Sequence, residues 1–235
     1  MLNQQSVKKL QKIVSEHKGC INLPKLGRWK AMTDGSIWLS IVGQVGVVGG
    51  SAPVEKMMKE LRTNDKWYEA LVAMRPAQQR KEIHKILHSF GIRYVSENAK
   101  ECRKTNALLK NLALVESYDG PKAYLEYISS IADEHLRVAA IIENMSYIKN
   151  KGARDFLIGV GLIENAIAFD VRIKKILIAC GVNVPEDLGT NKATYKALEA
   201  ELIEKVCKPC GVTGAVLDRV LYQKFKEIIE QFAAM

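Results

Sequence analysis

Apolar residues recur along this chain at the three- and four-residue spacing of amphipathic helices. The stripes are clearest near the two ends of the chain, at Val7, Leu10, Ile13 and Val14, and at Leu217, Leu221, Phe225, Ile228 and Phe232. The second stripe predicts a single last helix that Thr213 caps. Glycine- and proline-containing turns separate further stripes, and together they indicate about ten helices with short loops. The alternation of a strand is confined to the short candidate 92–95. We therefore predict an all-α fold.

Two of the predicted helices begin at residues that can carry chemistry. One runs from Lys151 to Val160 and stops at Gly161, and the next begins at Val171, directly after Asp170. The residues just before Asp170 are apolar, and a carboxylate in such a context needs a reason because burying a charge costs free energy.

A lysine attacks carbon only when its amine is neutral, a form that burial or a neighbouring cation favours. Lys149 and Arg154 lie close to Lys151 in the sequence. A carboxylate facing that amine can stabilise positive charge on a sugar or relay protons. We therefore treat Lys151 as a candidate nucleophile and Asp170 as its helper. The spacing alone rather favours a solvated loop lysine and an aspartate that caps the helix starting at Val171, because aspartate is a preferred N-cap residue.

Composition places the chain among ordinary globular proteins. It has 235 residues, of which 48% are hydrophobic and 26% charged, enough for one large domain or two small ones. No apolar run approaches the ~18 residues of a membrane span, and the polar N-terminus lacks the apolar region of a signal peptide. The five cysteines are an odd number spread along the chain, which favours a reducing compartment, so a cytoplasmic protein without membrane contact is expected.

The charge balance indicates a polyanionic partner. The formal net charge is +9 and the isoelectric point is about 9.2, which favours nucleic acid. The segment 80–104 is locally basic and either faces phosphates or forms a solvated surface. Whole-chain charge is equally compatible with a basic protein that never binds nucleic acid.

The region around the two candidate residues resembles the helix-hairpin-helix-GPD DNA glycosylases. The residues that carry the resemblance are Lys151-Gly152-Ala153-Arg154-Asp155-Phe156-Leu157, then Gly161, then Ala166-Ile167-Ala168-Phe169-Asp170-Val171-Arg172-Ile173. They are most similar to the 8-oxoguanine DNA glycosylase/AP lyases of bacteria and archaea. The resemblance implies that Lys151 attacks the sugar C1′ and that Asp170 assists.

Weaker similarity runs along most of the chain. Residues 37–45, including Gln44, resemble the family's early helix, and residues 91–100 and 211–221 resemble later segments. The resemblance implies a two-lobed helical fold with the active-site cleft between the lobes. We expect residues 36–171 to form a central lobe, and residues 1–35 and 172–235 to form a terminal lobe.

The hairpin before Lys151 departs from the family pattern. Family members have glycine, an apolar residue and glycine there, so that backbone amides approach a DNA phosphate closely. Tyr147, Ile148 and Lys149 occupy those positions here. Side chains are therefore expected to take a larger share of the phosphate contact. The expected DNA-binding residues are Gln44, Lys149, Asn150, Gly152 and Arg154.

No metal or cofactor site is expected. Cys207 and Cys210 form a lone CxxC, which lacks the further ligands that zinc or an iron–sulfur cluster needs. His84 and His88 share a helix face but no glutamate follows His84 in the metalloprotease pattern. These residues are best explained as ordinary thiols and surface imidazoles.

The resulting hypothesis is a bifunctional DNA glycosylase/AP lyase that uses no cofactor. It would remove an oxidised purine, 8-oxoguanine by resemblance, through a Lys151 Schiff base and β-elimination. Its partner would be double-stranded DNA with a damaged base. The protein would act as a monomer, and it would be associated with the nucleoid if the source is bacterial or archaeal. Two alternatives stay open. One is a non-catalytic DNA-binding helical protein, and the other is a monofunctional alkyl-base glycosylase in which Asp170 activates water.

Overall fold

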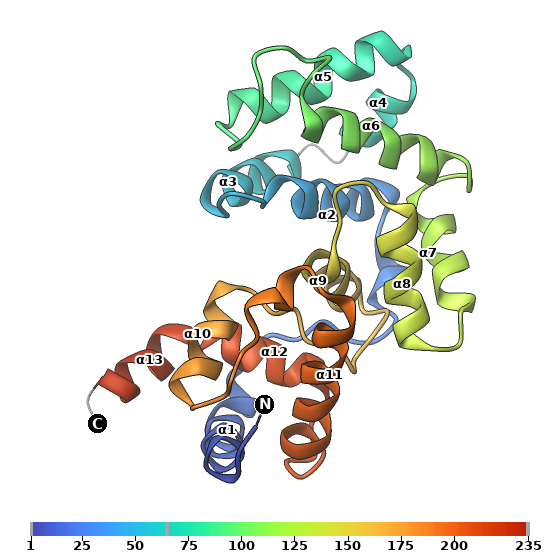
Figure 1. Cartoon of the computed structure of the whole chain (residues 1–235). Coiled ribbons are helices and arrows are strands. Elements are labelled where there is room, and N and C mark those ends of the chain that lie inside the picture. Colours follow the sequence, from blue (N-terminus) through green and yellow to red (C-terminus); the bar gives the residue numbers. More distant parts are fainter. Residues whose placement is uncertain (1, 64–65, 234–235) are drawn as a thin grey trace. The chain divides into compact units, whose positions relative to one another are not determined.

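The computed structural model describes residues 2–63 and 66–233. Over these residues the chain consists of helices, turns and irregular loops, without a strand (Figure 1). The main helices are α1 (Gln4–His17), α2 (Asp34–Gly46), α3 (Ala52–Leu61), α4 (Trp67–Val72), α5 (Pro76–Ser89), α6 (Arg103–Glu116), α7 (Pro121–Ser130), α8 (Glu134–Asn144), α9 (Asn150–Val160), α10 (Val171–Ala179), α11 (Lys192–Leu202), α12 (Gly214–Gln223) and α13 (Phe225–Ala233). Shorter helical segments are η1 (Lys18–Cys20), η2 (Arg28–Ala31), η3 (Glu186–Gly189) and η4 (Ile203–Cys207). The prediction of an all-α fold is confirmed.

The chain divides into two compact units. We call Gly27–Phe156 the central unit, and Met1–Leu26 together with Leu157–Met235 the terminal unit. The resemblance implies boundaries at 35/36 and 171/172 instead. Residues 157–171 belong to the terminal unit because Ile167 and Phe169 are buried in one apolar core with residues of α1 and α10 to α13. The second boundary therefore falls inside α9.

Helix α2 is the core of the central unit. Its buried residues include Ile37, Trp38, Ile41, Val42 and Val45, all 0% exposed, and it contacts α3, α4, α6 and α7. A helix that is apolar on most of its surface is stable only when other helices surround it. The Asp34 carboxylate accepts a hydrogen bond from the Lys122 amide at 2.7 Å, which ties the start of α2 to the start of α7.

The candidate strand at 92–95 is wrong, because this segment is a turn that packs on the end of α2. Arg93 Nη1 donates to the Gly49 carbonyl at 2.9 Å. Tyr94 has φ +60°, which is incompatible with a strand. A Cβ on Gly49 would lie 2.6 Å from the Tyr94 ring. Glycine at 49 therefore permits a contact that no other residue would allow.

The terminal unit buries the apolar faces of α1, α10, α11 and α12 in one core. Thr213 caps α12 as predicted, accepting a hydrogen bond from the Val216 amide at 3.4 Å. The stripe predicted as one last helix is broken at Lys224, where the backbone leaves helical geometry with ψ +14°. The result is two helices, α12 and α13, in place of one.

Among the described residues, no helix combines the length and the apolar character that crossing a bilayer requires.

Candidate active site

Residues 145–149 connect α8 to α9 and are anchored in the central unit. Asn111, a fully buried residue of α6, donates from Nδ2 to the Ser146 carbonyl at 3.1 Å. Its Oδ1 accepts from the Ser146 amide at 2.7 Å. Ile148 is 1% exposed and holds the other end of the connection. The start of α9 is thus presented on a connection fixed at two points.

Tyr147 has φ +67°, a left-handed conformation that glycine adopts without strain. Tyr147 stands where the resembling family has the first glycine of its hairpin. In a residue other than glycine this conformation costs about 1–2 kcal/mol. The connection between α8 and α9 therefore has a backbone at Tyr147 that is more usual for glycine.

Lys151 lies in the first turn of α9 and pairs with a carboxylate that the sequence analysis did not select. Its Nζ lies 2.8 Å from Asp155 Oδ2, and the two side chains are 33% and 23% exposed. Residues four apart lie on the same side of a helix. That spacing is the sequence signal for the pairing of Asp155 with Lys151.

Gln44 of α2 joins this pair. Its Nε2 donates to the same Asp155 oxygen at 3.2 Å. The other end of the amide, Oε1, is buried and accepts no hydrogen bond within the described part of the chain. A buried polar atom without a partner costs about 1–3 kcal/mol, so Gln44 is held in a position that is unfavourable for this oxygen.

Gly152 packs beside Gln44 and Ile148. A Cβ at position 152 would lie 3.6 Å from Gln44 Oε1 and 3.4 Å from Ile148 Cγ2. Both are ordinary van der Waals distances, so an alanine would fit at position 152. The structure brings together Gln44, Lys151 and Gly152, three of the residues singled out from the sequence, and adds Asp155.

The remaining expected DNA-binding residues differ in exposure. Lys149 is exposed and Asn150 is 7% exposed. Arg154 is 1% exposed, and its Nη1 donates to the Asn150 carbonyl at 3.1 Å. The expectation of a phosphate contact by Arg154 does not fit this burial. The side chain instead holds the first turn of α9 from within the fold.

Asp170, in the terminal unit, is the N-cap of α10. Its Oδ1 accepts from the Arg172 amide at 2.9 Å and from the Ile173 amide at 2.8 Å. The capping role left open by the sequence is therefore present. Both bonds use one carboxylate oxygen, so the cap fixes the orientation of the second oxygen without engaging it.

Three buried side chains hold the segment that ends at Asp170. The amides of Ile167, Ala168 and Phe169 donate to Glu199 Oε1 at 2.8 Å, Asp218 Oδ1 at 2.7 Å and Tyr195 Oη at 2.9 Å. Glu199, Asp218 and Tyr195 are at most 1% exposed. Each partner lies 26 to 50 positions later in the chain, so no sequence pattern near Asp170 could have revealed it.

Lys104, which the sequence grouped with the basic segment 80–104, does not face solvent. It is 0% exposed, and its Nζ donates to the carbonyls of Gly46 at 2.8 Å and Val48 at 2.7 Å. Burial lowers the pKa of Lys104 from 10.5 to about 8. This ammonium closes the C-terminal end of α2, just after Gln44.

Among the described residues, no three histidine, cysteine, aspartate or glutamate side chains gather in a group that could hold a metal ion. Cys207 and Cys210 are both free thiols. Burial raises the pKa of Cys207 to about 12, so this thiol stays protonated and poorly reactive at neutral pH.

Among known proteins, the chain matches solved structures only. No family model matches the sequence, and no curated protein matches it. Solved structures do match over nearly the whole chain. The 8-oxoguanine DNA glycosylase of Methanocaldococcus jannaschii superposes with a TM-score of 0.65 at 14% identity, covering 92% of this chain and 91% of that one.

Two further structures agree. The M. jannaschii 8-oxoguanine glycosylase/lyase in complex with a 15mer DNA containing 8-oxoguanine gives a TM-score of 0.63 at 14% identity, covering 94% of this chain and 91% of that one. The 8-oxoguanine DNA glycosylase of Thermotoga maritima gives 0.64 at 16% identity, covering 92% and 93%. The chain therefore has the all-helical fold of the 8-oxoguanine DNA glycosylases.

Proposed function

We propose that this chain is a bifunctional DNA glycosylase and AP lyase that removes 8-oxoguanine from double-stranded DNA. The observation that carries the proposal is the position of Lys151. It lies at the start of α9, partly exposed, with its amine held by Asp155, which Gln44 also contacts. The shared fold and the net charge of +9 support a DNA substrate. In this proposal α8 and α9 form the helix-hairpin-helix and the protein acts as a monomer.

The damaged nucleotide would first leave the base stack. The neutral Lys151 amine then attacks C1′, and the bond from C1′ to the base breaks with its electron pair leaving on the base. Asp170 stabilises the positive charge that develops on the sugar. The resulting secondary ammonium loses a proton, and the C1′–O4′ bond then breaks with its electron pair going to O4′, which takes up a proton. This ring opening leaves a protonated Schiff base between Lys151 and C1′. Removal of a C2′ proton then expels the 3′ phosphate by β-elimination.

The ion pair adds a step to this mechanism. An ammonium paired with a carboxylate is not a nucleophile, so Lys151 has to lose a proton before attack. Asp155 is within hydrogen-bond reach of that proton at 2.8 Å. We assign Asp155 the role of holding the amine until the substrate enters and of accepting or relaying its proton.

The hairpin would hold the DNA backbone beside the reacting sugar. The first amides of a helix have no acceptor within the helix and carry partial positive charge. At the start of α9 they lie next to the exposed Lys149. Lys149 and these amides are the groups that we assign to a phosphate near the lesion, with Asn150 and Gly152 contributing backbone.

Borohydride trapping on a duplex with one 8-oxoguanine tests the proposal. Wild-type protein should form a covalent adduct, and Lys151→Gln should form none while still binding the duplex. Lys110→Gln, which removes an exposed lysine of α6, is the control for the same change of charge and should trap like wild type.

Two other outcomes identify the alternatives. Both alternative functions are considered because Lys151 and Asp170 already have structural roles. Lys151 is an ion-pair partner and Asp170 is a helix cap. Base release without adduct or strand cleavage indicates a monofunctional glycosylase in which Asp170 activates water. DNA binding without base release indicates a non-catalytic DNA-binding protein.

A further inference from the structure

One face of α12 contacts the segment that carries Asp170 at three successive turns of the helix. The residues of this face, which we call the α12 face, are four apart and therefore lie on one side of the helix: Gly214, Asp218 and Tyr222. Their partners are Ala166, Ala168 and Arg172, in the same order along the chain. Asp170 thus lies between the second contact and the third.

The first contact requires a glycine. A Cβ on Gly214 would lie 2.9 Å from the Ala166 amide nitrogen and 3.0 Å from the Ala166 carbonyl oxygen. Both are backbone atoms, which cannot move aside as the end of a flexible side chain can. The adjacent Ala215 amide donates to the Glu164 carbonyl at 2.8 Å, which holds the two backbones together at this point. A side chain at position 214 would therefore displace either the segment or α12.

Side chains make the other two contacts. Asp218 Oδ1 accepts from the Ala168 amide at 2.7 Å, and both residues are buried. The guanidinium carbon of Arg172 lies 4.7 Å from the centre of the Tyr222 ring, which is a cation–π contact. Ala168 precedes Asp170 by two positions and Arg172 follows it by two. The same helix therefore holds the chain on both sides of this carboxylate.

The lengths of the two segments match. Residues 166–170 form no regular secondary structure, and the Asp170 backbone is extended, with φ −86° and ψ −179°. Four residues of an α-helix rise about 6 Å, and two residues of extended chain span about 6.6 Å. One turn of α12 therefore covers about the same length as two residues of extended chain, so a rigid helix can hold the segment at regular intervals.

We propose that the α12 face positions the Asp170 carboxylate for the reaction. The helix cap fixes this carboxylate relative to the first turn of α10, and the α12 face fixes that turn and the segment before it. Its members are positioning residues because they act through Asp170. This role rests on the proposed function, in which Asp170 stabilises charge on the sugar. A misplacement of about 1 Å can lower a rate by up to about 100-fold.

The test changes the first and third contacts separately. Gly214→Ala adds one methyl group against the Ala166 backbone. Tyr222→Leu removes the ring, whereas Tyr222→Phe keeps an aromatic face for the guanidinium. Gly189→Ala is the control for the added methyl group. Gly189 belongs to the same unit, and a Cβ there would meet no other atom within 4 Å in the described part of the chain.

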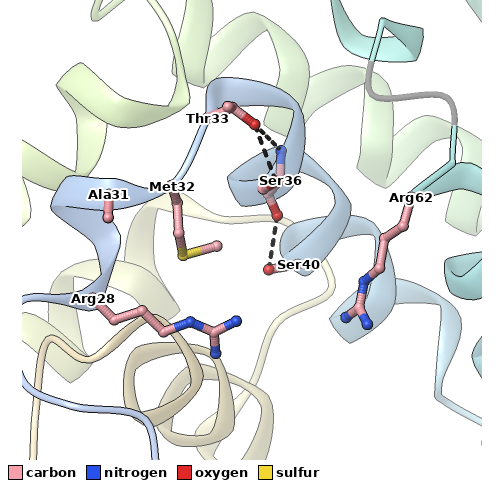
Figure 2. Close-up of a pocket in the computed structure, with 7 residues that line it drawn as sticks. All are labelled: Arg28, Ala31, Met32, Thr33, Ser36, Ser40 and Arg62. Carbon is pink, nitrogen blue, oxygen red and sulfur yellow. Dashed lines mark hydrogen bonds between the residues drawn. The ribbon is translucent and has the colours of Figure 1, made fainter.

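A second control lies in the central unit. Ser40→Ala removes the 3.0 Å hydrogen bond from Ser40 Oγ to the Ser36 carbonyl, at a cavity of about 430 Å³ beside the first turns of α2 (Figure 2). This variant loses a side-chain contact while the α12 face stays intact. It therefore shows what such a loss does by itself.

The rate of borohydride adduct formation is measured at saturating duplex, and duplex affinity is measured in the Lys151→Gln background. Gly214→Ala should lower the rate about tenfold and Tyr222→Leu severalfold, with affinity unchanged. Tyr222→Phe and both controls should match wild type. In the Asp170→Asn background neither Gly214→Ala nor Tyr222→Leu should lower the rate further, because residues that act through one group are not additive.

Hydrogen exchange follows the segment without any chemistry. The amides of Ile167, Ala168 and Phe169 should exchange faster in Gly214→Ala than in Gly189→Ala, because looser packing lets the segment open more often. Urea denaturation shows whether each variant is folded. If Gly214→Ala does not fold, the comparison of Tyr222→Leu with Tyr222→Phe decides.

Wild-type rates in both Gly214→Ala and Tyr222→Leu would overturn the positioning role, while adduct formation by the wild type would leave the proposed function standing. Weaker duplex binding by Tyr222→Leu would also overturn it and indicate a DNA contact by this ring. If wild-type protein forms no adduct, the proposed function fails. Faster exchange in Gly214→Ala would then still show that the α12 face holds the segment.

Discussion

Asp155 Oδ2 accepts a hydrogen bond from Lys151 Nζ at 2.8 Å, one turn along α9. The same oxygen accepts from Gln44 Nε2 at 3.2 Å. One carboxylate therefore fixes both a candidate nucleophile and a side chain of the helix at the centre of the unit. Substitution of Asp155 therefore changes the contacts of both residues while the Lys151 amine stays in place.

Asp155→Asn should slow borohydride adduct formation by about tenfold, because a neutral amide holds the ammonium less strongly and does not accept its proton, and hydrogen bonds to charged groups contribute about 1.5–3 kcal/mol. Lys151→Gln should remove the adduct completely. Glu143→Gln, at an exposed carboxylate of α8, is the matched control. Adduct formation at or above the wild-type rate in Asp155→Asn would show that the carboxylate restrains the amine and takes no part in proton transfer.

Substitution of Tyr147 separates backbone strain from side-chain contacts. Tyr147→Gly and Tyr147→Val both remove the ring, but valine keeps the strain at φ +67° and is β-branched. The valine variant should unfold with a free energy about 1–2 kcal/mol below that of the glycine variant, measured by urea denaturation. Equal stabilities would mean that the hairpin changes its backbone conformation when the ring is absent.

Lys104 should make stability depend on pH. Its pKa is lowered by burial from 10.5 to about 8, so the folded protein releases this proton at a lower pH than the unfolded chain. Between pH about 8 and 10.5 the unfolded chain binds more protons than the folded protein, so the free energy of unfolding rises with pH. The total gain, reached above both pKa values, is about 3 kcal/mol. Below pH about 8 both states are charged and this contribution is absent.

Lys104→Met is the reference for that measurement, because it lacks the titrating group. Denaturation of both proteins from pH 7 to 10.5 should give curves that diverge, with the wild type gaining stability relative to the variant. Parallel curves would show that the buried amine does not change its charge in this interval.

Asp218 should act on Asp170 by holding the Ala168 amide at 2.7 Å. Asp218→Ala leaves a buried amide without an acceptor, and a loss of roughly 2–4 kcal/mol in unfolding free energy is expected. Asp218→Asn keeps an acceptor oxygen and should recover much of that loss. If positioning is the role, adduct formation at saturating DNA should fall in Asp218→Ala and recover in Asp218→Asn, whereas duplex affinity should change little in either.

Much of the helical architecture could be read from the sequence, because helical periodicity and capping involve residues within four positions of each other. Thr213 at the start of α12 and the helix beginning at Val171 are examples. The break at Lys224 was missed because the apolar stripe continues across it. The turn at 92–95 is not visible in the local sequence because its left-handed Tyr94 packs against the distant Gly49.

The sequence by itself determined that the chain is helical and that Lys151 and Asp170 stand at the starts of successive helices, since both follow from local patterns. Tertiary structure alone decided what surrounds them. Gln44 reaches Asp155 across 111 positions of the chain, Asp218 reaches Ala168 across 50, and Arg154 and Lys104 are buried where their charge suggests exposure. Such contacts depend on how helices pack, and packing is set by the whole apolar surface of each unit.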